Sequence, residues 1–302
     1  MNDNIISIFI DKIVFSVERE FSNVSNAFKK LSTFLTVSSI FVGFTGFFQT
    51  FAGYILLGIV PSFMICLVVF LITFSVYSLN KLTDQNEDAI NMPERQKFLK
   101  DKNRLILYVA LLAYAFSMLI ASMQKLSDLL IILIPPAANA IYSLRLLPGI
   151  PRFKDIPVMK NLFVALSWAL VCTLMPASQM SELTVAVAFV IYFMLARVFI
   201  NTAIFDIRDV EGDSKNGIRT LPVLLGSSRT TVILLAINST LLPWLWLFGS
   251  AKALAEIMVA YGYAIILYFH KRRNPLALDL FVDGEWMIAC IAFLLLRAAT
   301  RS

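Results

Sequence analysis

Three polar residues recur at every fourth position directly after an apolar run: Asn80, Asp84 and Asp88 in "NKLTDQNED". On a helix, this spacing places all three side chains on one stripe. Two carboxylates one turn apart repel each other, and acids at the C-terminal end of a helix oppose its macrodipole. A hard divalent cation between the oxygens would offset that repulsion. On this stretch alone, a metal site and a solvated helix end are both open interpretations.

A second acidic cluster lies in "DIRDVEGDSKNG". Asp209 and Asp213 repeat the four-residue carboxylate spacing, and Asp206 lies one turn before Asp209. We expect Gly212 and Gly217 to turn the chain just after the helix. Mg²⁺ prefers one or two carboxylates together with substrate phosphate oxygens. Two such clusters facing one cavity therefore indicate a diphosphate held by two or more Mg²⁺ ions.

Basic and hydrogen-bonding residues near both clusters could neutralise phosphate oxygens. The predicted diphosphate-binding residues are Lys81, Tyr142, Arg145, Lys154, Lys160, Asn161, Arg208 and Arg219. Cations in such loops also serve as membrane anchors. For Arg145, Lys154 and Lys160 both roles stay open.

The elements that carry the clusters are strongly apolar. The 302 residues are 59% hydrophobic and 15% charged, whereas a soluble domain is about 45–50% apolar and about 25% charged. Long apolar windows in such a chain are expected to be transmembrane helices. We therefore predict an all-α, polytopic membrane protein of one domain with nine transmembrane helices. The predicted spans are 31–48, 51–79, 105–123, 129–147, 162–175, 183–205, 231–248, 254–269 and 281–299, with "QTFAG" separating the first two.

The net charge of +6 has an explanation in topology. If nine helices alternate in direction, most of the 26 Lys and Arg residues fall on the side that carries the N-terminus and both acidic clusters. The positive-inside rule places that side in the cytoplasm. We expect residues 1–30 to lie on the cytoplasmic membrane surface. No nucleic-acid partner is needed to account for the charge.

Arg197 lies well inside the predicted apolar span 183–205. An intramembrane charge is a functional candidate, and its simplest expected role is to pair with a carboxylate of the second cluster. The three cysteines lie far apart in apolar runs and give neither a disulfide framework nor zinc-site spacing.

The two acidic stretches together resemble a known family. "NKLTDQNED" resembles the first aspartate motif, NxxxDxxxD, of the UbiA superfamily of intramembrane prenyltransferases, and "DIRDVEGDSKNGIRTLPVLLG" resembles its second. "IYSLR" and the following "KN" are similar to the segment after the family's fourth helix. The resemblance implies nine helices around a central cavity, cytoplasmic caps that bind an isoprenyl diphosphate through Mg²⁺, and an apolar tunnel open to lipid. The second motif is closest to those of archaeal geranylgeranylglyceryl phosphate prenyltransferases and of chlorophyll and homogentisate enzymes.

The predicted reaction is ionisation of an allylic diphosphate and capture of the carbocation by a lipophilic acceptor. Metal ions would stabilise the leaving diphosphate. The predicted catalytic residues and metal ligands are Asn80, Asp84, Asp88, Asp206, Asp209 and Asp213. The basic loops favour geranylgeranylglyceryl phosphate as the acceptor, with an aromatic quinone or chlorophyll-type precursor as the alternative.

Two other classes of protein are weighed against this interpretation. A transporter would place its site near the membrane midplane, at broken helices. A phosphatidyltransferase of the CDP-alcohol type would use one composite aspartate motif on fewer helices. Two separate clusters at one membrane face favour the prenyltransferase.

Overall fold

The computed structural model describes residues 26–83, 102–143, 156–215, 217–272 and 274–300. Every regular element in those ranges is a helix, which confirms the predicted all-α class. The elements run in chain order as α2 (Asn26–Val37), α3 (Ile40–Leu56), α4 (Phe63–Thr83), α7 (Asn103–Gln124), α8 (Leu126–Ile132), α9 (Ile134–Ser143), α10 (Met159–Ala177), α11 (Val185–Lys215), α12 (Leu221–Leu225), α13 (Ser227–Ser239), η2 (Leu242–Ala251), α14 (Lys252–Phe269), α15 (Pro275–Leu278), η3 (Asp279–Asp283) and α16 (Glu285–Ala299).

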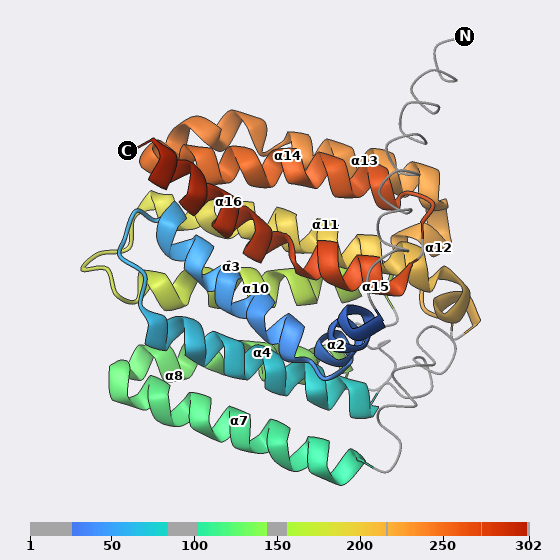
Figure 1. The fold of residues 1–302 in the computed structure, drawn as a ribbon, viewed down its shortest axis with the longest axis horizontal. Coiled ribbons are helices and arrows are strands. Elements are labelled where there is room, and N and C mark those ends of the chain that lie inside the picture. The colour runs from blue at the N-terminus through green and yellow to red at the C-terminus, as the bar shows by residue number, and fades with distance from the viewer. Residues whose placement is uncertain (1–25, 84–101, 144–155, 216, 273, 301–302) are drawn as a thin grey trace.

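Helix α3 lies at the centre of the bundle, in contact with α4, α10, α14 and α16 (Figure 1). Two of its glycines permit close helix contacts. A Cβ at Gly46 would overlap the Thr73 hydroxyl of α4, and one at Gly53 would overlap the Cys172 carbonyl of α10. Small residues that let backbones approach are typical of packing between membrane helices.

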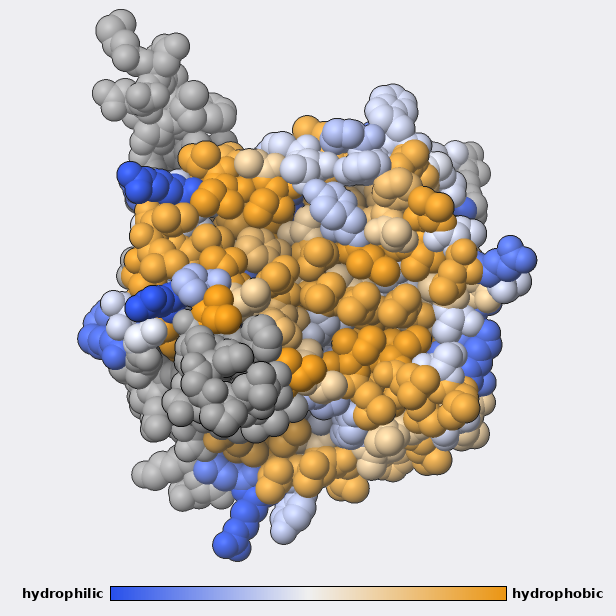
Figure 2. All heavy atoms as spheres, turned by 180° about the vertical axis from the view of Figure 1, so that it is seen from behind, coloured by the Kyte–Doolittle hydropathy of each residue, from blue (hydrophilic) through white to orange (hydrophobic). Residues whose placement is uncertain are grey.

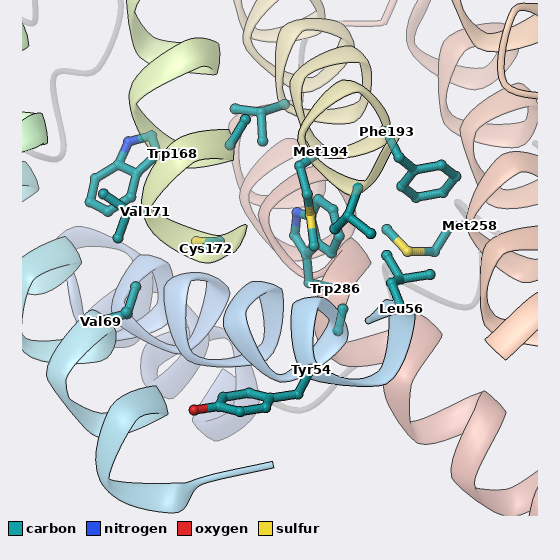
Figure 3. Close-up of a cluster of buried hydrophobic side chains, with 14 of the residues drawn as sticks. Tyr54, Leu56, Val69, Trp168, Val171, Cys172, Phe193, Met194, Met258 and Trp286 are labelled. Atoms are coloured by element: carbon teal, nitrogen blue, oxygen red, sulfur yellow. The ribbon is translucent and has the colours of Figure 1, made fainter. Parts of the chain in front are cut away.

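Large apolar side chains fill the space around α3. Trp286 of α16, Phe193 and Met194 of α11 and Met258 of α14 are almost fully buried and converge next to α3 (Figure 3). Side chains of this size make many dispersion contacts when close-packed. They join α3, α11, α14 and α16 in one core.

The outer surface is also apolar. Figure 2 shows one face covered mainly by hydrophobic side chains, with hydrophilic atoms towards the two lateral edges. Helix α7 exposes Leu105, Leu112 and Phe116, each more than half accessible. An apolar surface of this extent is that of an integral membrane protein. Within the described ranges, five helices are long and apolar enough to span a membrane: Phe63–Leu82, Asn103–Gln124, Met159–Ala177, Val185–Lys215 and Leu242–Phe269.

The predicted boundary between the first two spans is wrong. "QTFAG" lies inside α3, and the chain leaves the helix only after Leu57, where Gly58 has φ of 72° and Pro61 follows. A helix tolerates one buried glycine, but it does not continue through a left-handed residue followed by proline. The first span is also bent: α2 meets α3 at 73°, next to Ser39, which has φ of 67°.

Other predicted spans differ in their ends. The window 129–147 is divided between α8 and α9, and the window 231–248 between α13 and η2. Helix α11 continues to Lys215, so Gly212 lies inside the helix rather than in a turn. The prediction for Gly217 is confirmed, because this residue follows the helix with φ of 72°. The longer helix carries the entire second acidic cluster.

Candidate active site

The second acidic cluster, defined as Asp206, Asp209 and Asp213, lies in the last three turns of α11 at the end of the bundle where α2 and α12 also lie (Figure 1). The segment before α10 and the segment after α11 meet there, because the Val158 amide donates to the Arg219 carbonyl at 3.3 Å. Residues from α10, α11 and η3 build the surroundings of the cluster.

Asp206 is held from the first turn of α10. The Asn161 amide nitrogen Nδ2 donates to Asp206 Oδ2 at 2.7 Å, and Lys160 Nζ lies 3.6 Å from Asp206 Oδ1. The Asp206 side chain is almost completely buried, while Lys160 keeps about a third of its surface exposed. Buried carboxylates need such charge-assisted partners. The structure thus brings together three of the predicted site residues.

Asp209 pairs with its own neighbour in sequence. Arg208 donates from Nε to Asp209 Oδ1 at 2.7 Å and from Nη2 to Oδ2 at 2.9 Å, a bidentate arrangement. The guanidinium also lies over the Phe205 ring, 5.2 Å from its centroid. Arg208 was predicted to bind the diphosphate and Asp209 to bind a metal ion. In this structure the two side chains bind each other.

Asp213 lies on the last helical turn and is buried. Its carbonyl accepts from the Ile218 amide at 2.8 Å, which closes the turn around Gly217. The Arg219 side chain is exposed, beyond that turn.

The first acidic cluster is described only at its start. Asn80 is on the last turn of α4 and is half-buried. Lys81, next to it, is buried and donates from Nζ to the carbonyls of Thr36 and Val37, at 3.1 and 2.7 Å. Asp84 and Asp88 lie outside the described residues.

Lys81 therefore binds the C-terminal carbonyls of α2 in this structure. Of the other predicted diphosphate ligands, Tyr142 is on the last turn of α9. Arg145 and Lys154 lie outside the described residues.

Sequence reasoning missed a third acidic segment, Asp279–Glu285. Asp279 Oδ1 lies 3.7 Å from Arg208 Nη1. The signal was present in "DLFVD", because Asp279 and Asp283 repeat the four-residue spacing of the two clusters.

The expected partner of Arg197 was also wrong. Arg197 is fully buried and pairs with Glu285 of α16, through Nε at 2.8 Å and through Nη2. Its Nη1 donates to Asn238 of α13 at 2.6 Å. Residue 197 lies about two and a half turns before Asp206, too far along α11 to reach the cluster.

The chemistry of the donor set fits Mg²⁺. Within the described ranges, no group of three or more His, Cys, Asp or Glu side chains is placed to hold a metal ion. Mg²⁺ does not require such a cage, because it usually binds one or two carboxylates together with substrate phosphates and water. Asp206 and Asp209 each already face a protein cation. The carboxylates are thus arranged to bind positive charge.

Comparisons with known proteins identify the family of this chain. Residues 31–282 match the model of the UbiA prenyltransferase family. A digeranylgeranylglyceryl phosphate synthase from Thermococcus kodakarensis is 26% identical over 245 residues, which cover 78% of this chain and 84% of that protein. A synthase of the same name from Sulfolobus acidocaldarius is 29% identical over 174 residues, or 57% of this chain and 60% of the relative.

A solved structure has the same fold. It is a UbiA homologue from Archaeoglobus fulgidus, determined with GPP and Mg²⁺ bound, which superposes with a TM-score of 0.60 over 85% of this chain and 99% of its own, at 19% identity. The family model covers most of the chain, including the whole second cluster and Asp279. This chain belongs to the UbiA prenyltransferase family.

Proposed function

We propose that this protein transfers a prenyl group from an isoprenyl diphosphate to geranylgeranylglyceryl phosphate, forming an ether lipid. The observation that carries the proposal is the second cluster, in which two carboxylates lie at one end of an apolar bundle, each beside a cation. This is a place for a charged head group with an apolar tail. The curated relatives named digeranylgeranylglyceryl phosphate synthase support this acceptor.

Mg²⁺ is the proposed cofactor. When bound, it would neutralise charge on the leaving diphosphate. The ligands we propose are Asn80, Asp84, Asp88, Asp206, Asp209 and Asp213. The Archaeoglobus fulgidus homologue was solved with GPP and Mg²⁺ bound, which supports the choice of metal and the diphosphate class of donor.

The chain's own residues would orient the donor and exclude water. Lys160 and Arg208, together with Lys81, Tyr142, Arg145, Lys154, Asn161 and Arg219, would supply positive charge and hydrogen bonds where the diphosphate gains negative charge. The C1–O bond breaks with its electron pair going to the diphosphate. The acceptor hydroxyl then forms the new bond to C1 and releases its proton. Apolar helices keep water from the carbocation in the interval.

We further propose that the chain is one domain and crosses the membrane nine times. The crossing segments would be α3, α4, α7, α8 with α9, α10, α11, α13, η2 with α14, and α16. The positive-inside rule then places the acidic clusters at the cytoplasmic face, with residues 1–30 along the membrane surface. Lipid surrounds the bundle, and no nucleic acid takes part.

Release of diphosphate tests the function. Purified protein in detergent receives geranylgeranyl diphosphate and Mg²⁺ with either geranylgeranylglyceryl phosphate or an aromatic quinone precursor. We expect release only with the glycerol phosphate acceptor, and its loss in Asp84→Ala and Asp209→Ala. Release only with the aromatic acceptor would assign the protein to the other branch. No release with any acceptor, together with Mg²⁺-independent binding of the diphosphate that is equal in all variants, would instead indicate a transport protein.

A further inference from the structure

The segment 279–285 runs antiparallel to α11 and pairs with it at three levels. Arg197 binds Glu285, Asn201 Nδ2 donates to the Val282 carbonyl at 3.4 Å, and Arg208 faces Asp279. Residues 197, 201 and 208 are spaced to lie on one stripe of α11. The segment thus packs along α11 as far as the second acidic cluster.

The backbone of this segment is held in place by hydrogen bonds from neighbouring helices. Residues Asp279–Asp283 form one π-helical turn, and the peptide carbonyls in such a turn are displaced from α-helical bonding. Three successive carbonyls accept side-chain hydrogen bonds from three helices. Tyr261 of α14 donates to Phe281 at 2.9 Å, Asn201 of α11 to Val282, and Thr45 of α3 to Asp283 at 2.8 Å. Asp279 therefore begins an element, η3, whose backbone is bound to α3, α11 and α14.

Arg208 lies between two carboxylates. Its Nε and Nη2 bind Asp209, while Nη1 has no hydrogen-bond partner among the described residues and lies 3.7 Å from Asp279 Oδ1. The Arg208 side chain is only 9% exposed. A small rotation of the side chain would exchange one carboxylate for the other.

A metal ion at Asp209 would compete with Arg208 for the same carboxylate. The two Asp209 oxygens that would face a cation are now occupied by the guanidinium, and a divalent cation there would repel it. A buried guanidinium released without another partner is strongly destabilising. Asp279 is a carboxylate within reach that can receive it.

We propose that Asp279 is a positioning residue: it accepts Arg208 when Asp209 binds the divalent cation, and so sets the affinity of the second cluster for metal. This inference rests on the proposed function only in taking Asp209 as a metal ligand. Arg208 holds Asp209 neutralised until metal and diphosphate arrive.

A double-mutant cycle on metal affinity tests the proposal. Mn²⁺ alone is titrated into the purified full-length protein, and free Mn²⁺ is counted by electron paramagnetic resonance. The variants are Asp279→Asn, Arg208→Gln and their combination, with Asp209→Asn to locate the site. We expect Asp279→Asn to weaken Mn²⁺ binding by about fivefold or more, a usual size for coupled sites. Arg208→Gln should bind Mn²⁺ more tightly than the wild type, and adding Asp279→Asn to it should change nothing further.

Three outcomes would overturn the proposal. The first is an equal effect of Asp279→Asn with and without Arg208, because Asp279 would then act without the arginine. The second is unchanged or weaker Mn²⁺ binding in Arg208→Gln. This measurement does not need the Asp279→Asn variant, so it tests the proposal even if that variant does not fold. The third is undiminished Mn²⁺ binding in Asp209→Asn. Failure of the proposed function is separate, since it would show as absent diphosphate release by the wild type while the coupling persists.

Discussion

The Asp206 carboxylate shows how single residues shape the site. It is buried on α11, and its hydrogen bond from Asn161 joins the second cluster to the first turn of α10. The exposed part of Lys160 supplies charge from the same turn. Neighbouring residues of α10 thus divide two tasks, hydrogen bonding and neutralisation, at one carboxylate.

Removal of the Asn161 side chain should therefore impair both stability and catalysis. Asn161→Ala leaves a buried carboxylate oxygen without its donor, which costs about 1.5–3 kcal/mol for a charged group. We expect a lower thermal midpoint in detergent and a lower rate of diphosphate release. Leu162→Ala is the matched control, because Leu162 is 39% exposed on the same turn. Equal effects of the two substitutions would contradict a specific role for the hydrogen bond.

Lys81 allows a second prediction at this scale. A lysine that holds the end of α2 and a lysine that binds the diphosphate should respond differently to substitution. Its Nζ binds the last carbonyls of α2, at Thr36 and Val37. Lys81→Met should lose about 1.5 kcal/mol of local stability, and amide exchange in the last turn of α2 should rise about tenfold. Measurement uses hydrogen–deuterium exchange beside the KM for the prenyl diphosphate. A raised KM with unchanged exchange would instead favour Lys81 as a diphosphate ligand.

At the scale of elements, a buried ion pair fixes α11 against its neighbours. Arg197 joins α11 to Glu285 of α16 and Asn238 of α13, and a Cβ at Gly262 of α14 would overlap its guanidinium. Asn238 also donates to the Val259 carbonyl of α14 at 3.0 Å. Helices α11, α13, α14 and α16 thus all contact the Arg197 guanidinium, which lies on the N-terminal side of the acidic cluster along α11.

Breaking this pair should destabilise the bundle. Arg197→Met leaves Glu285 buried and uncompensated, a loss of about 3–5 kcal/mol. The double variant Arg197→Met/Glu285→Leu removes both charges, so we expect it to recover much of that loss. Thermal unfolding of the purified proteins measures the difference. If the double variant were less stable than the single one, the pair would not be the source of the effect.

The sequence predicted helices well and their ends poorly. Apolar windows report where a helix is buried in lipid or protein, but not where its backbone changes direction. Helix α3 continues through "QTFAG" because Gly53 fits against α10, whereas Ser39 and Gly58 take left-handed conformations that no hydropathy window reveals. Likewise, α11 continues past its apolar stretch to Lys215.

The site was predictable only in part for a similar reason. Spacing within one helix indicates which side chains share a face, and so both clusters could be proposed. Asp279 is 70 positions after Asp209 in the chain, and only the packing of η3 along α11 brings it to Arg208. Glu285 was missed as the partner of Arg197 because the pair joins two helices.

At the scale of the molecule, the two ends of the bundle differ. One end carries the second cluster, α2 and α12, and Arg208 with Asp279. At the other end, Lys125 Nζ donates to the Ser178 carbonyl, between the loops that follow α7 and α10. The proposed reaction would therefore take place at the end that carries the second cluster, and the side of the membrane on which that end lies would decide which pool of substrate the protein uses.

Two serine-to-cysteine substitutions test that orientation. Ser214 is exposed beside the second cluster, and Ser181 is exposed at the opposite end. The native Cys66, Cys172 and Cys290 are all buried, so they should give little background with a membrane-impermeant thiol reagent. We expect Ser214→Cys to react only in inverted membrane vesicles and Ser181→Cys only in right-side-out ones, because the basic loops favour the cytoplasm. The reverse pattern would place the site outside and contradict the proposed topology. Labelling of both cysteines from one side would mean that α11, the one proposed span between Ser181 and Ser214, does not cross the membrane.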